Sequence, residues 1–437
     1  MLANGNARKS WRSTRVAQQL GIDYPIIQAP FGGLPSQRLT ATVSNLGGLG
    51  SLGAVTLGSS AISDVIAEIR SLTSKPFAIN LWVSTSDRKA SQVGLGVIEE
   101  RIRALAQYYT ELGTEPPSKV EAKPQDFETQ VRAVIDAGVP VLSFIYGIPP
   151  SEILDECRRR KIKTIGTATT PEEASALEQA GFEFIVASSF EGGGHRGSFP
   201  RSPAESLMGG FALIPRVVDI VKLPVIAAGG IADGRGLAAA FALGAEGVQI
   251  GTALLPCADS GASEAYRSAL SSFAANGTDL TDAFTGRLAR GIRNRLMNEF
   301  RHASSPPLPF PVQHALTQTV ATPASAQGAL ELMTIWAGQN ASLCHLKQAM
   351  RATWMAGDFG QIARYMEREA EAFVERRGIL LAEHVQGPVV DCRPSKMWVV
   401  EAGSEIGLEH DRLDSGCPLF RPAQSPGCVQ PSIRCVS

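Results

Sequence analysis

Residues 224–236 read Pro-Val-Ile-Ala-Ala-Gly-Gly-Ile-Ala-Asp-Gly-Arg-Gly, a short apolar run followed at once by a glycine turn. Four consecutive apolar residues, Val225 to Ala228, are typical of a strand buried on both faces. The next strand candidate, Gly247 to Ile250, is also followed by a turn residue, Gly251. Two such runs in succession predict parallel strands whose carboxyl ends carry glycine turns.

The same unit recurs from residue 20 to residue 255. Amphipathic stretches at 61–72, 130–137 and 171–180 separate the apolar runs, as helices that cover a parallel sheet would. The last stretch starts with Thr170 and Pro171, a capping residue and a first-turn proline. Eight strand-helix units predict a TIM (β/α)8 barrel of the α/β class. The eight runs are 26–28, 49–52, 77–80, 141–144, 164–167, 184–187, 225–228 and 247–250.

Glycine turns follow the seventh and eighth predicted strands, where barrel enzymes often bind phosphate. Gly229 and Gly230 end the seventh strand, and Gly251 and Thr252 end the eighth. Their backbone N–H groups could converge on one phosphate. A glycine that merely closes a tight bend is the alternative for either turn alone, but two turns at consecutive strand ends favour phosphate binding.

A histidine in a glycine-rich loop follows the sixth predicted strand. The loop reads Glu-Gly-Gly-Gly-His-Arg-Gly-Ser-Phe over 191–199, and its His195 is one of six histidines in the chain. Imidazole takes and gives protons near neutral pH, and glycines let a flat cofactor approach the backbone. A flexible surface loop with an incidental histidine is the alternative.

Two further features lie at the same predicted rim. The loop after the first strand reads Gln-Ala-Pro-Phe-Gly-Gly over 28–33, and Asn80 ends the third strand. An asparagine in an apolar strand must be hydrogen-bonded. Both a cofactor contact and a purely structural bond to neighbouring backbone would satisfy Asn80, and the sequence leaves the two open.

Composition excludes several classes of protein. The chain is 44% hydrophobic and 19% charged with a net charge of -1, so it can bury a large core and has no electrostatic reason to bind nucleic acid or an anionic membrane. No membrane span or secretory signal is expected. We predict a soluble, cytoplasmic protein. The alternative is import into an organelle, because the basic first fifteen residues weakly resemble a transit peptide.

Cysteine spacing and other motifs exclude further chemistry. Four of the seven cysteines crowd the last forty-six residues, but no Cys-x-x-Cys pair occurs, so no metal site is expected. Reduced thiols are the default for such a protein. No carboxylate pair, Ser-His-Asp order or Walker-type loop has supporting context, which argues against a hydrolase or a kinase.

Seven segments, taken in order, make the chain resemble the nitronate monooxygenase family, formerly called 2-nitropropane dioxygenases. The resemblance covers Arg12 to Leu346 and fades beyond it. The segments are PIIQAPFGG (25–33), VSNLGGLGSLGA (43–54), PFAINLWVS (76–84), EGGGHRGSF (191–199), PVIAAGGIADGRG (224–236), GVQIGT (247–252) and FTGRLARGIRNR (284–295).

This resemblance implies an FMN-dependent oxidoreductase on a TIM barrel with a smaller, mainly helical second domain. The barrel would span 12–276, with 264–276 as its last helix, and the second domain 277–346. Residues 347–437 would form a C-terminal extension of unknown role, partly irregular, with a helix over 359–377. The proline cluster at 306–311 predicts an extended connector.

The resemblance also implies roles for individual residues. His195 would act at the substrate side of the flavin, as a base or as a hydrogen-bond donor to the nitro group. The residues that would contact the cofactor come from four loops and two strands. They are Ala29, Pro30, Phe31, Asn80, Ser188, Gly193, Gly229, Gly230, Gln249, Gly251 and Thr252.

The implied reaction is the oxidation of alkyl nitronates, and of neutral nitroalkanes if they are accepted, with O2 to a carbonyl compound and nitrite. A neutral His195 could remove the acidic proton beside a nitro group while negative charge spreads onto the nitro oxygens. The expected partners are therefore a small-molecule substrate and O2, and the oligomeric state is left open.

The chain departs from the family pattern at three places. Ser188 and Ser189 stand where many members have glutamine and glycine, which shortens one expected contact to FMN and predicts weaker cofactor binding. Gly192 replaces an alanine, a mild change. Phe31 stands where methionine is common and would reshape the pocket beside the flavin.

Other functions remain as alternatives. One is an FMN-dependent enoyl-acyl-carrier-protein reductase, which shares this barrel and loop but needs NAD(P)H. The other is a flavin-binding protein without catalysis, which would explain why Ser188 departs from the family pattern. A relative of IMP dehydrogenase is disfavoured because no cysteine follows the sixth strand. The basic group Arg287, Arg290, Arg293 and Arg295 is expected to be solvated or internally paired.

Overall fold

The structure is a computed structural model that describes residues 11–122, 124–272, 277–303 and 305–344 in full. Residues 374–437 form a separate unit, of which the structure describes a two-stranded antiparallel hairpin, β13 (Val399–Glu401) and β14 (Ser404–Ile406). The helix predicted over 359–377 and the four cysteines near the end of the chain lie outside the described residues.

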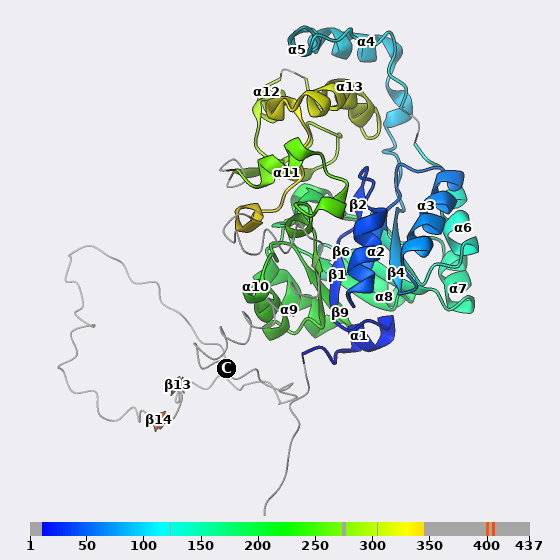
Figure 1. Cartoon of the computed structure of the whole chain (residues 1–437), viewed down its shortest axis with the longest axis vertical. Coiled ribbons are helices and arrows are strands. Elements are labelled where there is room, and N and C mark those ends of the chain that lie inside the picture. Colours follow the sequence, from blue (N-terminus) through cyan, green and yellow to red (C-terminus); the bar gives the residue numbers. More distant parts are fainter. Residues whose placement is uncertain are drawn as a thin grey trace, which may run out of the picture. The chain divides into compact units, whose positions relative to one another are not determined.

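Eight parallel strands close into a TIM barrel, as the sequence predicted (Figure 1). Every predicted apolar run forms a strand, and the two-residue β2 (Phe31–Gly32) adds to β3. The ring closes where Ile27 of β1 bridges Leu49, beside β3, while β1 pairs with β10 on its other side. The barrel strands are β1 (Ile26–Gln28), β3 (Gly50–Gly53), β4 (Phe77–Trp82), β5 (Val141–Ile145), β6 (Lys163–Ala168), β7 (Phe184–Ser188), β9 (Val225–Ala228) and β10 (Gly247–Ile250).

Helices cover the outside of the barrel. Local signals fix their ends: the Thr170 side chain accepts a hydrogen bond from the Glu173 amide, and Pro171 occupies the first turn, as predicted. Isoleucine and leucine side chains on the inner faces of these helices pack on the strands. The covering helices are α2 (Gln37–Asn45), α3 (Ser59–Leu72), α6 (Phe127–Asp136), α7 (Ser151–Arg159), α8 (Pro171–Ala180), α9 (Gly210–Ile220) and α10 (Gly234–Ala242).

The barrel interior is filled by side chains, with one end plugged. Phe184, Ile165 and Ile226 form an inner cluster together with Val16 and Leu20 of α1 (Arg15–Leu20). In Figure 1 α1 lies at one end of the barrel and α13 at the other. Because α1 closes the amino-terminal end, the open end is the one where the strands finish and their loops begin.

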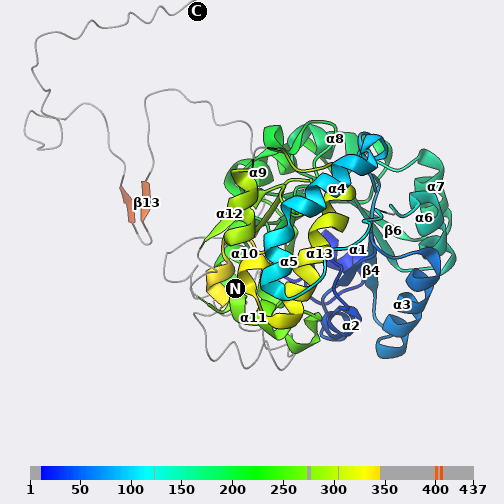
Figure 2. The same cartoon turned by 90° about the horizontal axis from the view of Figure 1, so that it is seen from above.

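A second hydrophobic cluster lies in helices that cover the open end (Figure 2). Residues 95–112, inserted between β4 and α6, contribute Tyr108 and Tyr109 to it, which the sequence did not reveal. The predicted helix 264–276 ends at Leu270, and its Tyr266 belongs to this cluster. The helices are α4 (Leu95–Ala104), α5 (Ala106–Leu112), α11 (Glu264–Leu270), α12 (Arg295–Arg301) and α13 (Val312–Gln327).

The domain division at residue 276 stays a prediction, but the packing shows that the helical part draws on two stretches of chain. The proline cluster 306–311 connects α12 to α13 without regular structure.

Short 3-10 turns complete the described chain. They are η1 (Ala90–Gln92), η2 (Pro203–Ser206), η3 (Thr252–Leu254), η4 (Ala258–Ser260), η6 (Leu330–Leu332) and η7 (Ala341–Cys344).

A small antiparallel sheet links the helical part to the barrel loops. It consists of β11 (Thr278–Thr281), β12 (Ala289–Ile292) and β8 (Gly194–His195), with Ala289 opposite His195. The predicted catalytic loop is therefore a strand paired with residues ninety positions away, and the alternative of a flexible surface loop does not hold.

Gly50 allows α2 to lie directly against β3, and we expect Gly50→Ala to destabilise the barrel. A Cβ at this position would lie 1.9 Å from the Thr40 carbonyl oxygen, a backbone atom that cannot move alone. The free energy of unfolding should fall by about 2–4 kcal/mol, measured by denaturant unfolding. Gly96→Ala is the matched control, because a Cβ there meets nothing within 4 Å; equal stability of the two variants would contradict this account of the packing.

Candidate active site

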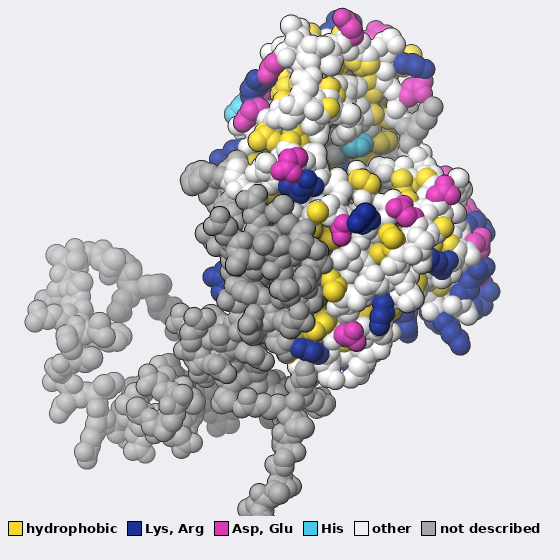
Figure 3. Space-filling view, viewed as in Figure 1, with side chains coloured by type: hydrophobic (Ala, Val, Ile, Leu, Met, Phe, Trp, Pro, Cys, Tyr) yellow, Lys and Arg dark blue, Asp and Glu magenta, His cyan; other side chains and the backbone are white. Residues whose placement is uncertain are grey.

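One cavity of about 800 Å³ opens at the carboxyl ends of the strands. Figure 3 shows the surface hollowed between the barrel and the helices above it, with a histidine side chain visible inside. The cavity is lined by all twelve residues that the sequence analysis singled out, from Ala29 to Thr252. The structure thus brings them together, while their individual roles stay predictions.

The glycine turns after β9 and β10 offer unused hydrogen-bond donors to this cavity. The amide N–H groups of Gly229, Gly230, Gly251 and Thr252 donate no hydrogen bond within the part of the chain that the structure describes. Gly229 and Gly230 have φ of 107° and 68°, a backbone conformation that residues other than glycine rarely adopt. Converging free N–H groups are the donor set that a phosphate monoester requires.

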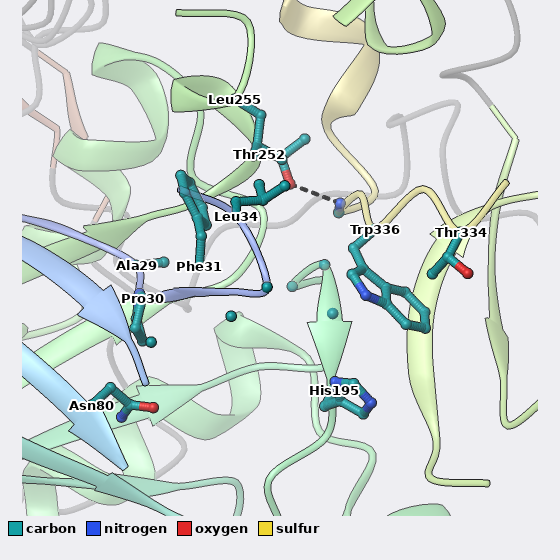
Figure 4. A pocket seen from close by; sticks show the side chains of 18 of the residues that line it. Ala29, Pro30, Phe31, Leu34, Asn80, His195, Thr252, Leu255, Thr334 and Trp336 are labelled. Carbon is teal, nitrogen blue, oxygen red and sulfur yellow. Dashed lines mark hydrogen bonds between the residues drawn. The ribbon is translucent and has the colours of Figure 1, made fainter. Parts of the chain in front are cut away.

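A segment from the helical part crosses these turns. The Thr252 hydroxyl accepts a hydrogen bond of 2.9 Å from the Gly338 amide (Figure 4). The Asn340 side chain donates to the Gly230 carbonyl, and the Gln339 amide donates to the Glu191 carbonyl at 2.9 Å. Residues 338–340 therefore hold both turns and the histidine loop in one arrangement.

The side of the cavity at β1 and β4 is flat and mostly apolar. Ala29, Pro30 and Phe31 follow β1, and Asn80 lies on β4 beside them (Figure 4). The Asn80 side-chain amide donates to the Ser143 hydroxyl at 2.9 Å, a structural bond to a side chain and not to the neighbouring backbone. The side-chain Oδ1 of Asn80 accepts no hydrogen bond within the described residues, so it can accept one from a ligand.

The two serines that depart from the family pattern are held by a buried arginine. Arg196 donates to the Ser188 carbonyl at 2.8 Å and to the Ser189 carbonyl at 2.6 Å. Ser188 lines the cavity. The Ser189 hydroxyl is buried and has no partner among the described residues, and a Cβ on Gly229 would lie 2.1 Å from it. Ser189 therefore restricts position 229 to glycine.

His195 faces Asn80 and Pro30 across the cavity (Figure 4). Its ring makes an edge contact with Trp82 at 4.9 Å and lies 5.2 Å from the ring of Trp336. Its Nε2 lies 2.9 Å from the Thr285 hydroxyl oxygen. Two aromatic rings and one hydroxyl thus fix the orientation of the imidazole.

The Thr285 hydroxyl connects His195 to the chain segment before β12. Its single hydrogen has two acceptors within reach, Nε2 of His195 at 2.9 Å and the Arg287 carbonyl at 3.1 Å. When the hydrogen points to the carbonyl, Nε2 carries the ring proton and Nδ1 keeps its lone pair. In that arrangement Nδ1 of the neutral imidazole can act as a base.

The surroundings keep this imidazole uncharged. Burial first, and then the positive charge of Arg287 and the neighbouring His314, lower the pKa of His195 from 6.5 to about 3. His195 is consequently neutral throughout the neutral pH range.

The arginines near the cavity do not enter it. Arg287 pairs with Asp87 at 2.8 Å and stacks on the rings of Tyr146 and Phe310. Arg290 donates to the Phe190 carbonyl at 3.0 Å, and Arg295 pairs with Glu111 at 2.5 Å. The basic group is internally paired, as expected. No Asp, Glu, Lys or Arg among the described residues lines the cavity.

Sequence reasoning missed four residues of this site: Trp82, Thr285, His314 and Trp336 line the cavity. Trp82 and Thr285 lie inside segments that carried the family resemblance, so their presence there was a usable signal. His314 is on α13, and burial lowers its pKa. Nothing in the pattern around His314 and Trp336 indicated that α13 and the segment 334–338 face the barrel.

The fold and this cavity define a flavin-dependent oxidoreductase built on a TIM barrel. The family model for nitronate monooxygenase matches residues 13–350. A probable nitronate monooxygenase from Staphylococcus aureus (strain Newman) is 40% identical over 358 residues, which are 82% of this chain and 99% of that protein. The chain belongs to the nitronate monooxygenase family.

Solved structures agree with this assignment. A nitroalkane oxidase from Streptomyces ansochromogenes is similar with a TM-score of 0.71 and 32% identity, covering 82% of this chain and 99% of that one. FabK from Thermotoga maritima is similar with a TM-score of 0.64 and 27% identity, covering 84% and 99%. None of the helices in the described part of the chain has the length and apolar composition needed to cross a membrane.

The low pKa of His195 predicts that the protein loses stability as the pH falls below 6.5. The unfolded chain binds a proton at this residue near pH 6.5, whereas the folded protein does so only near pH 3. Between these values the free energy of unfolding should fall by up to about 1.4 kcal/mol per pH unit from this group. Unfolding of the wild type and of His195→Gln between pH 7 and 5 should give a shallower slope for the variant; parallel slopes would contradict the burial of a neutral imidazole.

Proposed function

We propose that the protein is an FMN-dependent nitronate monooxygenase that oxidises alkyl nitronates with O2 to a carbonyl compound and nitrite. The observation that carries this proposal is the placement of a neutral, oriented His195 across one cavity from four free N–H groups of the phosphate-type turns. Membership of the family and the similarity to a nitroalkane oxidase support it.

The residues present fit FMN. The turns at Gly229–Gly230 and Gly251–Thr252 would hold its phosphate, and the wall formed by Ala29 to Phe31 with the free oxygen of Asn80 would hold its ring. The buried, unpartnered hydroxyl of Ser189 adjoins the first turn. When bound, FMN would take up the electrons of nitronate oxidation and pass them to O2.

The residues of the protein would bind, orient and deprotonate the substrate. Nδ1 of His195 would take the proton from the carbon beside a nitro group, since Thr285 occupies Nε2. The positive charge of Arg287 stays behind Trp82 at 5.5 Å from the ring centre, where it opposes protonation of His195 and stabilises an anion in the cavity. Trp82 and Trp336 would hold the imidazole from two sides, through ring contacts at 4.9 and 5.2 Å.

The reductase alternative is less well supported by the site. FabK is the more distant of the two solved relatives in identity and TM-score. A dinucleotide carries a pyrophosphate, and an NADP a further phosphate, yet the four free N–H groups of the turns would already hold the phosphate of FMN. No cationic side chain among the described residues lines the cavity to bind these further charges.

Anaerobic mixing tests the proposal. FMN-loaded protein should be reduced rapidly by butyl nitronate and slowly or not at all by NADH and NADPH, followed by flavin absorbance. Readmission of O2 should release nitrite in proportion to the nitronate consumed. Fast reduction by NAD(P)H with none by nitronate would instead identify a reductase, and protein that takes up no FMN would indicate a non-catalytic relative.

The base and its orientation give a second prediction. His195→Ala should lower kcat/KM for neutral nitrobutane by about 100-fold or more, the usual contribution of a general base, and much less for preformed butyl nitronate. Thr285→Val should lower activity on the neutral substrate in the same selective way because the ring loses its orientation, whereas Thr285→Ser should restore it. Equal losses of kcat/KM on both substrates would show that His195 is not the base.

A further inference from the structure

Three chain segments of the site meet at one carboxylate, that of Asp87 in the loop after β4. Its Oδ1 accepts a hydrogen bond of 2.9 Å from Nε of Arg287. Its Oδ2 accepts one of 3.0 Å from the Phe310 amide, and the Asp87 amide donates to the Phe310 carbonyl at 2.9 Å. Asp87 therefore joins the barrel loop to the segment before β12 and to the segment before α13.

Arg287 depends on these contacts because it is buried. Its side chain is 7% exposed, and its guanidinium carbon lies 4.5 Å from the ring centres of both Tyr146 and Phe310. The guanidinium also donates to the Ser84 carbonyl at 2.9 Å and to the Ser84 hydroxyl at 3.1 Å. A buried cation without a partner is strongly destabilising, and Asp87 supplies the opposite charge.

The backbone of Arg287 continues this connection to His195. Its amide donates to the Thr285 hydroxyl at 3.3 Å, and its carbonyl lies 3.1 Å from the same hydroxyl. That hydroxyl lies 2.9 Å from Nε2 of His195. A chain of contacts thus runs from Asp87 through Arg287 and Thr285 to the imidazole, and none of its members is among the residues expected to hold FMN.

We propose that Asp87 is a positioning residue for His195, which acts through Arg287 and Thr285 and does not itself line the cavity. This inference rests on the proposed function, in which His195 is the base. The carboxylate suits the task because its two oxygens accept from two different segments. An asparagine has one acceptor oxygen, so Asp87→Asn can keep the bond to Arg287 or the bond to Phe310, but not both.

Selective loss of base-dependent turnover tests this role. With FMN-loaded enzyme, Asp87→Asn should lower kcat/KM for neutral nitrobutane by about tenfold or more and that for preformed butyl nitronate by less than about threefold, because only the neutral substrate needs the base. A matching fall in both values would overturn the inference.

Glu111→Gln is the matched control. Glu111 pairs with Arg295 at 2.5 Å in the helical part and does not line the cavity. Loss of this ion pair should leave the ratio of the two kcat/KM values unchanged. If Glu111→Gln shifts the ratio as much as Asp87→Asn does, the effect is a general one of lost ion pairs and the inference fails.

A double-mutant cycle identifies the route from Asp87 to the imidazole. Thr285→Val already removes the hydroxyl through which Asp87 would act. Adding Asp87→Asn to it should therefore lower kcat/KM for nitrobutane by less than about twofold further, since residues of one network are not additive. A further loss as large as that of Asp87→Asn alone would show an independent route and overturn the inference.

The imidazole itself gives a readout that needs no substrate. Nitrogen NMR signals of His195, assigned by their loss in His195→Gln, report which ring nitrogen carries the proton when the full chain is measured with FMN added. One tautomer should dominate in the wild type, whereas Asp87→Asn should populate both, because the partner of Nε2 is no longer held in place.

Ser84→Ala provides a milder variant should Asp87→Asn fail to fold. It removes one acceptor of Arg287 and keeps Asp87, so the ring signals should move in the same direction but less. Ring signals that stay unchanged in both variants overturn the inference. If the signals change but nitronates reduce no flavin, only the proposed function fails.

Discussion

Closure of the barrel between β1 and its two neighbours is the constraint on which the rest of the molecule depends. Ile27 bridges Leu49 on one side, and β1 runs parallel to β10 on the other. This contact brings the loop 29–31 beside Gly251 and Thr252, more than two hundred residues away in the chain. Without a closed ring, the loop 29–31 and the glycine turns after β9 and β10 would not line one cavity.

Within that ring, the chemistry of His195 is set by elements outside the barrel. The two-residue strand β8 pairs with β12, and Thr285, just before β12, supplies the oxygen that meets Nε2. Arg287 follows two residues later and depresses the imidazole pKa from behind an aromatic layer. This short segment thus adds to burial, the main cause of the lowered pKa, and shares with Trp82 and Trp336 in orienting the imidazole.

The barrel could be predicted from the sequence because each strand carries its own local signal, a short apolar run ended by glycine or a polar residue. All eight runs form strands, and Thr170 caps its helix as expected. The rim residues followed from the same signal, because strand ends of a parallel barrel share one face. Local pattern was sufficient wherever burial on both faces decided the structure.

The helical part could not be read in the same way. Its core is made by Tyr108 and Tyr109 from one stretch and by Leu316 and Met333 from another, and no periodicity links stretches separated by two hundred residues. Helix 264–276 was too long in the prediction because amphipathic pattern does not show where tertiary packing stops. His314 and Trp336 were missed for the same reason: they reach the cavity through the docking of α13 and the segment after it.

Residues 338–340 link the binding of a ligand at the turns after β9 and β10 to the docking of the helical part on the barrel. Their amides and the Asn340 side chain bond to Thr252, Gly230 and Glu191 at once. A ligand that orders those turns should also order residues 338–340. By thermodynamic reciprocity, docking of residues 338–340 should raise the affinity of the turns for that ligand by the same factor. The turns after β9 and β10 and the chain that covers the cavity are therefore coupled through these hydrogen bonds, and order in one favours order in the other.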